Sequence, residues 1–293
     1  MWYHLISFSF KTIMNIIDGR KIKSEILDEL KTKVLALPFP PIFCDILVGD
    51  DPVSASYVRI KGKAAESVGI KFKTVNFPES VTTEEIVEEI ENLNRVPLMS
   101  GIIVQLPLPN HIDTGTVLDA IDPKLDVDCL GSYNNSNFYN DMGGVAYPTA
   151  LSCMKLLESV GLDLSEKNIV VLGQGKLVGL PVTHLLEKEN LKVTVLNSKT
   201  EGQEEILKQA DVIISAIGRG KFITCDMVKE GVVIIDAGTS EENGAVVGDV
   251  DFDSVSNVAS YVTPTPGGVG PVTVAMLLQN VYQVALTRLG SSS

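Results

Sequence analysis

Apolar and polar positions along the chain follow two rhythms. Short apolar runs such as Ile42–Val48 and Asn168–Leu172 have the length and β-branched content of buried strands. Other segments, such as 18–35, carry apolar residues every fourth position, with Ile22 and Ile26 on one stripe, which predicts a helix with one buried face. Strands that alternate with helices are typical of parallel sheets covered by helices. We therefore expect an α/β fold.

The alternation runs through the chain in two series, separated by a loop rich in Asn, Gly and Tyr at 134–144. In the first series the pattern predicts helices at 18–35, about 54–68 and 82–94, and strands at 42–48, 70–77 and 101–106. Thr82 is a plausible N-cap for the third helix. In the second series it predicts a helix at about 150–160, strands at 168–172 and near 193, 212 and 232, and a final apolar helix at about 270–288.

A chain of 293 residues is long enough for two domains. We expect an α/β domain at 14–147, a Rossmann-like domain at 148–270, and a cleft between them. The last helix, within 271–289, should return to the first domain. Residues 1–13 form an N-terminal extension that is too short to span a bilayer and lacks a small-residue cleavage site.

Composition excludes several classes of protein. A formal net charge of −13 argues against a nucleic-acid-binding protein, which needs clustered Lys and Arg. The four cysteines and three histidines are scattered, so we expect no metal site. Cys44 and Cys153 lie in apolar segments and should be buried thiols. We expect a cytoplasmic protein that does not bind membranes.

A glycine loop follows the strand 168–172. The sequence Gly173-Gln174-Gly175 leads into a helix that begins near Val178 and Gly179. Glycines let the backbone approach a pyrophosphate, and a helix N-terminus offers free amides to the anion. A structural turn without a ligand would use the same residues, so both interpretations stay open.

The next strand ends in Asn197, Ser198, Lys199 and Thr200, without the acid that usually holds the ribose of NAD. Lys199 and two hydroxyls could instead hold a 2′-phosphate, which favours NADP, although Lys199 could also be a solvated surface residue. Two further strands end in segments that contain glycine: Ala216, Ile217 and Gly218, and Gly238 with Thr239. These glycines could let the nicotinamide half of the cofactor approach, or they could serve only the loops.

Tyr57 and Lys61 are four residues apart on a predicted helix and share one face. Gln105 follows apolar residues in a predicted strand, and a buried amide needs a partner. A lysine amine beside it in a dry site would release its proton readily, as acid-base catalysis requires. Asp126 and Asp128 alternate in an extended segment, where a carboxylate could hold a donor-rich heterocycle. On spacing alone, all of these could be ordinary surface residues.

At these segments the chain resembles the bifunctional methylenetetrahydrofolate dehydrogenase/methenyltetrahydrofolate cyclohydrolase family. The matching stretches, in order, are Val48-Gly-Asp-Asp-Pro52, Ser56-Tyr-Val-Arg-Ile-Lys-Gly-Lys63, Val104-Gln-Leu-Pro-Leu-Pro109, Asp126-Val-Asp128, Val178-Gly-Leu-Pro181, Val247-Gly-Asp-Val-Asp251 and Thr263-Pro-Thr-Pro-Gly-Gly-Val-Gly-Pro271. They cover nearly everything from Met14 to about Leu289. The resemblance implies that 14–147 with 271–289 binds folate and that 148–270 binds NAD(P).

The resemblance also implies roles for single residues. Tyr57 would stack on the folate, Lys61 would be the catalytic lysine tuned by Gln105, and Asp128 would hydrogen-bond the pterin. Substrate would be bound by Tyr57, Val104, Leu106, Pro107, Asp126, Asp128, Pro266, Gly267, Gly268 and Val269. Cofactor would be bound by Gly173, Gln174, Gly175, Val178, Gly179, Asn197, Ser198, Lys199, Thr200, Ala216, Ile217, Gly218, Gly238 and Thr239.

The implied activity is oxidation of 5,10-methylene-tetrahydrofolate with NADP, followed by hydrolysis of the methenyl product to 10-formyl-tetrahydrofolate, in a homodimer. Four departures bear on this expectation. Gln174 stands where the family usually has the Arg that reads the 2′-phosphate, so NAD is an alternative cofactor. Cys129 replaces a usual Gly and Leu125 a Lys, and Tyr147-Pro-Thr-Ala150 departs from Pro-Cys-Thr-Pro. The alternatives are an NAD-dependent dehydrogenase without cyclohydrolase activity and a silent folate- or nucleotide-binding protein.

Overall fold

A computed structural model describes residues 14–290 and divides them into two compact units. The first contains residues 20–152 and those from 271 onward, and we call it the three-stranded unit. The second contains residues 14–19 and 153–270, and we call it the six-stranded unit. The expected N-terminal extension, 1–13, lies outside the described residues.

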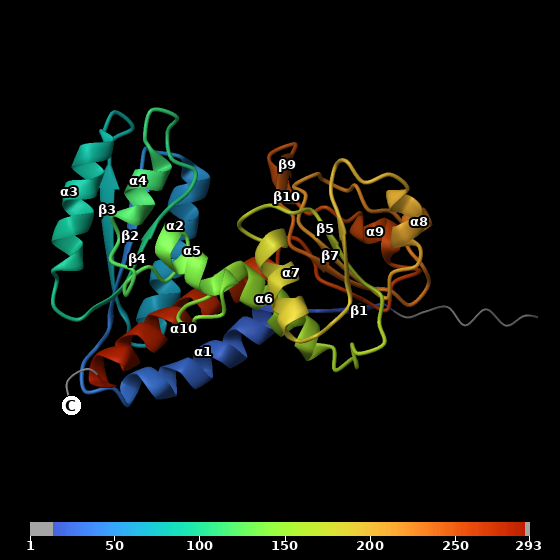
Figure 1. Ribbon diagram of the computed structural model, residues 1–293, viewed down its shortest axis with the longest axis horizontal. Helices are drawn as coiled ribbons and strands as arrows, with labels where there is room; N and C mark the ends of the chain where they lie inside the picture. Colours follow the sequence, from blue (N-terminus) through green and yellow to red (C-terminus); the bar gives the residue numbers. More distant parts are fainter. Residues whose placement is uncertain (1–13, 291–293) are drawn as a thin grey trace, which may run out of the picture. The chain divides into compact units, whose positions relative to one another are not determined.

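The three-stranded unit is built on a parallel sheet in the order β3-β2-β4. The central strand β2, Ile42–Val48, pairs with β3, Lys71–Phe77, and with β4, Met99–Val104. Its helices, seen around the strands in Figure 1, are α1 Gly19–Leu35, α2 Pro52–Ser67, α3 Thr83–Asn94, α4 Thr114–Asp119, α5 Ser132–Tyr139, the first turn of α6 Pro148–Ser159, and α10 Val269–Gly290. These elements match most of the predicted ones within a few residues.

Two helix starts show how capping decides an element's limits. Thr82 is the N-cap of α3, and with Glu85 it forms a capping box, as the sequence predicted. Helix α2 begins at Pro52 rather than near Ser54, because the Asp51 carboxylate accepts a 2.7 Å hydrogen bond from the Ser54 amide and proline suits the first turn.

The six-stranded unit contains a parallel sheet in the order β1-β11-β8-β7-β5-β6. Its strands are β1 Asn15–Ile16, β5 Ile169–Leu172, β6 Val193–Leu196, β7 Val212–Ser215, β8 Val233–Asp236 and β11 Tyr261–Val262. The chain leaves β5 for β6 on one side and returns to β7 on the other, which makes the carboxyl ends of β5 and β7 a topological switch point. In open α/β sheets, ligands bind at such a point.

Shorter elements complete the six-stranded unit. They are the rest of α6, α7 Gly179–Lys188, α8 Gln203–Leu207, the 3₁₀ turn Cys225–Met227, α9 Phe252–Val255, and the antiparallel hairpin β9 Ser240–Glu242 with β10 Ala245–Val247. Its core includes residues from β5, β7 and β8, among them Val170, Ile213 and Ile234.

Two expectations differ from the structure. Residues 15–16 were assigned to the first domain but pair with β11 in the six-stranded unit, through a 2.8 Å bond from the Asn15 amide to the Ser260 carbonyl. The segment 134–144 was expected to be a loop, but α5 occupies its first half, because Phe138 is buried and packs edge-on against Tyr139 and Tyr147. Tertiary packing here overrides weak helix propensity.

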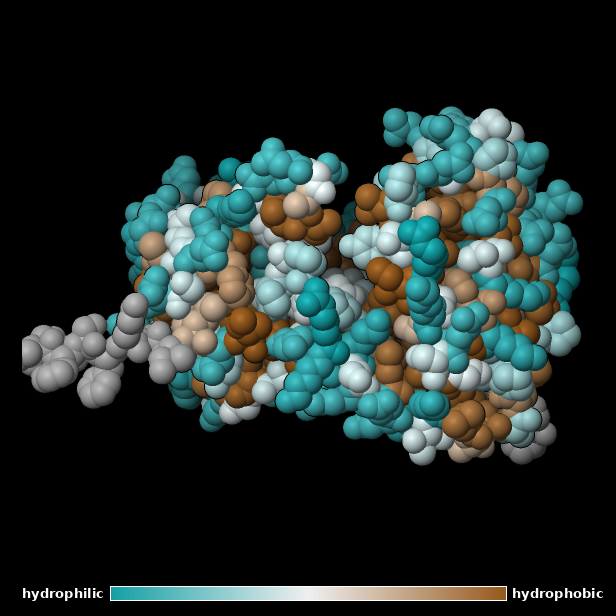
Figure 2. Space-filling model, turned by 180° about the vertical axis from the view of Figure 1, so that it is seen from behind, coloured by the Kyte–Doolittle hydropathy of each residue, from teal (hydrophilic) through white to brown (hydrophobic). Residues whose placement is uncertain are grey.

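Helix α10 is long and apolar enough to cross a membrane, but 61% of its most apolar window is buried. Val274, Leu278 and Val281 belong to the core of the three-stranded unit, so α10 serves as a core helix. Cys44 and Cys153 are buried, as predicted. Figure 2 shows hydrophobic areas interspersed with hydrophilic ones on one face, an ordinary pattern for a protein surface.

Candidate active site

Lys61 and Gln105 lie in direct contact in the three-stranded unit. Lys61 is on α2 and only 8% exposed, and its Nζ donates a 2.8 Å hydrogen bond to Gln105 Oε1. Gln105 is the first residue after β4, where its backbone amide donates to the Ile46 carbonyl at 2.8 Å. Its Nε2 donates to the Leu106 carbonyl at 2.9 Å, which leaves Oε1 turned toward Lys61. The predicted contact between these two residues is confirmed.

Asp45, which was not predicted from the sequence, forms the second contact of Lys61. It lies on β2 with no exposed surface, and its Oδ2 is 2.7 Å from Lys61 Nζ. Burial raises the pKa of Asp45, while the charge of Lys61 and a hydrogen bond from it act in the opposite direction. Lys61 is thus held between the amide oxygen of Gln105, at the end of β4, and the carboxylate of Asp45, within β2.

Tyr57 lies one helical turn before Lys61 and is 41% exposed. The Tyr57 side chain is therefore accessible to a ligand, whereas Lys61 is buried. Among the apolar residues expected to contact substrate, Val104 is buried at the end of β4, Leu106 is partly buried, and Pro107, after a cis peptide bond, is exposed. The exposed members could contact a ligand directly.

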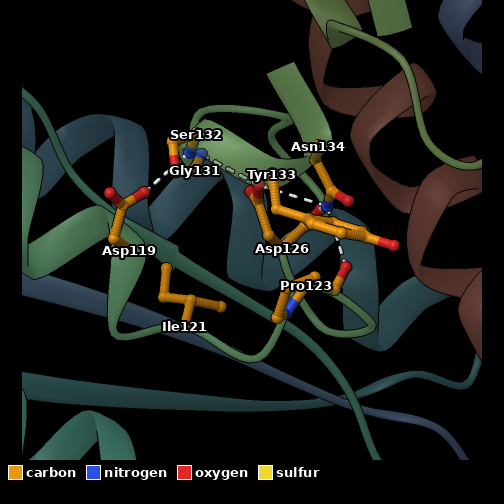
Figure 3. A pocket seen from close by; sticks show the side chains of 8 residues that line it. All are labelled: Asp119, Ile121, Pro123, Asp126, Gly131, Ser132, Tyr133 and Asn134. Carbon is orange, nitrogen blue, oxygen red and sulfur yellow. Dashed lines mark hydrogen bonds between the residues drawn. The ribbon is translucent and has the colours of Figure 1, made fainter. Parts of the chain in front are cut away.

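Asp126 and Asp128 behave differently from each other. The Asp126 carboxylate turns into its own loop and accepts hydrogen bonds from the amides of Leu130 and Gly131 and from the Asn134 side chain, at 3.0 to 3.3 Å. Figure 3 shows the contacts of Asp126 with Gly131 and Asn134 in a pocket of about 110 Å³. Asp119 accepts a 2.6 Å bond from the Ser132 amide in the same pocket. The polar groups that line it bind one another, so Asp126 fixes the shape of the loop.

Asp128 belongs to the electrostatic surroundings of Lys61. Burial raises its pKa to about 6, the charge of Lys61 lowers it, and the charges of Asp126 and Asp45 raise it. Asp45, Lys61 and Asp128 thus form one charged group of side chains. A carboxylate with a pKa of about 6 is still ionised at neutral pH and can accept hydrogen bonds there.

The residues near Asp128 that differ from the family pattern are compatible with the conformation of the loop. Cys129 stands where the family usually has Gly, and it has φ +61°, the left-handed conformation that glycine adopts at least cost. Its buried Sγ lies 3.5 Å from the Asn134 carbonyl. Tyr147 is 2% exposed and hydrogen-bonds Asn135. Leu125 is buried in the core. The unusual residues therefore pack inside the unit and keep the glycine-like turn.

The glycine loop of the six-stranded unit has two glycines that the fold requires and one that it does not. A Cβ on Gly173, which has φ +97°, would lie 2.5 Å from the Ala216 carbonyl oxygen. A Cβ on Gly179 would lie 2.1 Å from the Gly173 carbonyl oxygen. A Cβ on Gly175 would meet nothing within 4 Å. The open side of Gly175 lies before the N-terminus of α7, where a cofactor pyrophosphate could bind.

Gln174 points into this loop. Its Nε2 donates to the Gly173 carbonyl at 2.8 Å and to Thr183 Oγ1 at 3.2 Å. After β6, Asn197 and Thr200 close a turn through a 3.1 Å bond from the Asn197 amide to Thr200 Oγ1, and the Lys199 amide donates to Asn197 Oδ1 at 3.0 Å. Ser198 and Lys199 are exposed. Lys199 is thus the residue of this turn that can present a positive charge.

The ends of β7 and β8 are tied together by two buried carboxylates. Asp249 accepts hydrogen bonds from Ser215 Oγ and from the amides of Ile217 and Arg219, at 2.7 to 2.8 Å. Asp236 accepts from the amides of Gly238, Asp249 and Val250, at 3.0 to 3.1 Å, and burial raises its pKa to about 7. These carboxylates order the segments that contain Ala216, Ile217, Gly218 and Thr239.

Gly238 and Gly268 have internal reasons to be glycine. A Cβ on Gly238 would lie 2.0 Å from Asp249 Cγ, and one on Gly268 would lie 2.6 Å from Thr263 Cβ. Gly267 has φ +125° and follows a cis peptide bond between Thr265 and Pro266. Pro266, Gly267, Gly268 and Val269 therefore form a tightly packed turn at the start of α10. Their predicted contact with substrate remains a prediction.

Comparisons with known proteins identify the family of this chain. The chain matches the catalytic-domain model of tetrahydrofolate dehydrogenase/cyclohydrolase at residues 17–128 and the NAD(P)-binding-domain model at residues 147–289. This chain belongs to the tetrahydrofolate dehydrogenase/cyclohydrolase family. Both α/β units expected from the sequence are thereby accounted for.

Individual members of the tetrahydrofolate dehydrogenase/cyclohydrolase family cover the chain nearly end to end. The bifunctional protein FolD of Streptococcus thermophilus is 43% identical over 279 residues, which are 94% of this chain and 98% of the relative. FolD of Staphylococcus aureus strain N315 is 42% identical over 285 residues, 96% of this chain and 100% of the relative.

Solved structures agree in fold. The crystal structure of FolD from Campylobacter jejuni matches with a TM-score of 0.89 at 40% identity, covering 94% of this chain and 99% of that chain. The Trypanosoma brucei enzyme, solved with NADP and an inhibitor, matches with a TM-score of 0.89 at 37% identity, covering 94% and 98%.

Two residues of the site were not predicted from the sequence. Asp45 could have been found, because it is the one charged residue in the apolar run Ile42–Val48, and a buried charge requires a partner. Asn280 on α10 donates to the carbonyls of Val127 and Ala146, each at 2.8 Å, and so fastens the segment that carries Asp128. An Asn within an apolar helix signals such a bond, but the partners are more than 130 residues away in sequence.

Proposed function

We propose that this protein oxidises 5,10-methylene-tetrahydrofolate to 5,10-methenyl-tetrahydrofolate with NADP and hydrolyses the product to 10-formyl-tetrahydrofolate. Lys61 is the acid-base group. The observation that carries the proposal is the 2.8 Å contact between Lys61 Nζ and Gln105 Oε1 on a buried face of α2. Membership in the family and the bifunctional relatives support the same pair of activities.

The first step transfers a hydride from the methylene carbon and leaves a cation shared between N5 and N10. A fixed, uncompensated positive charge nearby would oppose this step. Lys61 satisfies that requirement, because the Asp45 carboxylate lies 2.7 Å from its amine and compensates a proton held there. Preorganised charges of this kind act most strongly where water is excluded.

The second step adds water to the methenyl carbon. The free amine of Lys61 takes a proton from the attacking water, and the bond between that carbon and N5 then breaks. One proton of the water ends on N5, the other leaves to solvent, and the oxygen remains in the formyl group on N10. Gln105 keeps the amine in place through its oriented Oε1. General acid-base catalysis of this type contributes about 10²- to 10⁴-fold.

Substrate binding falls to the residues around Lys61. The exposed ring of Tyr57 offers a surface for stacking on the pterin. Asp128 is ionised above about pH 6 and accepts hydrogen bonds from the donor edge of the pterin. Val104, Leu106 and Pro107 supply apolar contacts on the side of Gln105.

The six-stranded unit holds the cofactor, which supplies the hydride acceptor when bound. The open side of Gly175, the N-terminus of α7 and the switch point at β5 and β7 support dinucleotide binding. Exposed Lys199, with no acid at the end of β6, supports NADP. NAD is the second candidate, because the Gln174 side chain is neutral and bonded within its own loop.

A substitution at Gly175 tests the cofactor site. Because a Cβ there would meet no protein atom within 4 Å, Gly175→Leu is expected to keep the melting temperature but to weaken NADP binding at least tenfold. Gly173→Ala is the contrasting variant, since its Cβ clashes with Ala216 and lowers stability. Isothermal calorimetry with NADP and with NAD measures both the site and its preference. Unchanged NADP affinity in Gly175→Leu contradicts the proposed site.

Absorbance of the methenyl intermediate tests the proposed function itself. With methylene-tetrahydrofolate and NADP, the signal should rise and then decay faster than the spontaneous rate. A rise with NAD alone identifies the other cofactor. A rise without accelerated decay identifies a dehydrogenase that lacks cyclohydrolase activity, and no rise identifies a silent binding protein.

The family resemblance further supports a homodimer with contacts on the cofactor-binding unit, a cytoplasmic location, and a role in supplying formyl groups for purine biosynthesis. Sedimentation velocity of the full chain tests the dimer: a single monomeric species at micromolar concentration contradicts it.

A further inference from the structure

Asp45 lies in an apolar part of the three-stranded unit. It is in the middle of β2, opposite Thr74 of β3 and Ile103 of β4 in the strand register. Its chain neighbours Cys44 and Ile46 are fully buried, and Asp45 itself has no exposed surface. A carboxylate in such a place is costly unless its charge is compensated.

The compensating group is Lys61. Its Nζ lies 2.7 Å from Asp45 Oδ2, and the Lys61 side chain is only 11% exposed. Within residues 14–290, the oxygens of Asp45 have no polar partner besides Lys61. The ion pair with Lys61 is therefore the interaction that offsets the burial of this carboxylate. At 2.7 Å and with little solvent, the attraction is far stronger than between surface charges.

The contact also fixes where the amine lies. Gln105 Oε1 and Asp45 Oδ2 approach Nζ at 2.8 and 2.7 Å, one from the end of β4 and one from the middle of β2. An amide oxygen alone would accept a hydrogen bond from either the ammonium or the neutral amine. The carboxylate discriminates between these two forms, because it attracts the charged one.

We propose that Asp45 is a positioning residue for Lys61, whose carboxylate holds the ammonium form beside Gln105 and sets the pH at which Lys61 becomes the free base used in hydrolysis. The inference rests on the proposed function of Lys61. It adds an influence on the protonation of Lys61 that neither Gln105 nor Asp128 provides, because Asp45 is the acidic residue that forms an ion pair with the amine within residues 14–290.

Other charged or titratable groups lie near the pair. Asp128, from the segment after β4, couples to Lys61 and Asp45 through its charge, and Asp126 couples to Asp128. Cys44 lies next to Asp45 on β2, and Lys73 of β3 and Glu89 of α3 act on that thiol. These residues stay unchanged when Asp45 is replaced, so a shift on its replacement reports the ion pair.

The test uses the full chain with Asp45→Asn, which keeps the shape and removes the charge. Hydrolysis of methenyl-tetrahydrofolate is measured from pH 5 to 9. The acidic limb of the rate profile should move to lower pH by about one to three units, the range expected when an adjacent opposite charge is removed. Asp45→Val, which suits a buried strand, should move it in the same direction. Cys44→Ala, on the same strand, is the control and should leave the limb in place.

A second measurement does not depend on catalysis. Acetic anhydride acetylates only neutral amines, so the pH dependence of acetylation at Lys61, read by mass spectrometry, follows its protonation. The Asp45 variants should acetylate at lower pH than the unaltered protein. Unmoved rate and acetylation profiles in a folded Asp45 variant overturn the inference. Absence of hydrolysis by the unaltered protein instead overturns the proposed function and leaves the acetylation result to decide about Asp45.

Discussion

Lys61 has two polar neighbours, a neutral amide and a buried carboxylate. The carboxylate makes the removal of Lys61 costly. Lys61→Met leaves Asp45 without the charge that compensates it, which should lower the free energy of unfolding by about 3 kcal/mol. Adding Asp45→Asn removes the stranded charge and should recover most of that loss. Urea unfolding of both variants measures the difference. Equal stabilities of the single and the double variant would show that the unpaired Asp45 charge has no cost.

Asp128 gives the site a pH dependence of its own. Its folded-state pKa of about 6, raised by burial from 3.8, means that its protonated form favours folding. That contribution to stability is complete below about pH 4 and is lost as the pH rises through 6. Substrate binding has the opposite pH dependence, because a protonated Asp128 is no longer a charged hydrogen-bond acceptor.

The kcat/KM for methylene-tetrahydrofolate should therefore fall as the pH decreases below about 6. Asp128→Asn has no such group and should show a lower value that is flat between pH 5 and 7. Steady-state kinetics over that range decides the matter. A decline in the variant as steep as in the unaltered protein would assign the titration to another group.

At the scale of elements, the close approach of α2 to β3 places Lys61. Gly62 makes this approach possible, since a Cβ there would lie 2.6 Å from the Phe72 ring, which packs on Phe43. Gly62→Ala gains about 1 kcal/mol of helix propensity but incurs a clash of about 1–3 kcal/mol with the partly buried Phe72 ring.

We expect the clash to dominate and to displace α2, so that Gly62→Ala is less stable and hydrolyses methenyl-tetrahydrofolate more slowly. Ile60→Ala, on the exposed face of the same helix, is the matched control and should change stability by less than about 0.5 kcal/mol. Thermal unfolding and the decay of methenyl absorbance measure both effects. A more stable, fully active Gly62→Ala would show that helix propensity dominates.

Periodicity alone predicted most elements, because long helices and buried strands carry a strong apolar pattern. It failed where packing between distant segments decides: α5 depends on Phe138 meeting Tyr147, and β1 depends on a partner more than 240 residues away. The contact of Lys61 with Gln105 was expected from the family resemblance, because spacing alone left both as possible surface residues. The ion pair with Asp45 was not, because it depends on which face of β2 meets α2.

At the scale of the whole molecule, each unit has the elements that one of the two activities requires. The glycine loop and the strand ends of the six-stranded unit suit a dinucleotide, and the charged group around Lys61 suits folate chemistry. Hydride transfer needs the cofactor but no titrating amine, whereas hydrolysis needs the amine. Removal of Lys61 should therefore separate the two activities in a single protein.

The most direct measurement follows methenyl absorbance in Lys61→Ala supplied with methylene-tetrahydrofolate and NADP, with folate binding confirmed by fluorescence. We predict that the variant still forms the methenyl intermediate, which then accumulates and decays only at its spontaneous rate. Decay as fast as in the unaltered protein would contradict the account, because the water would then be activated by a group other than Lys61.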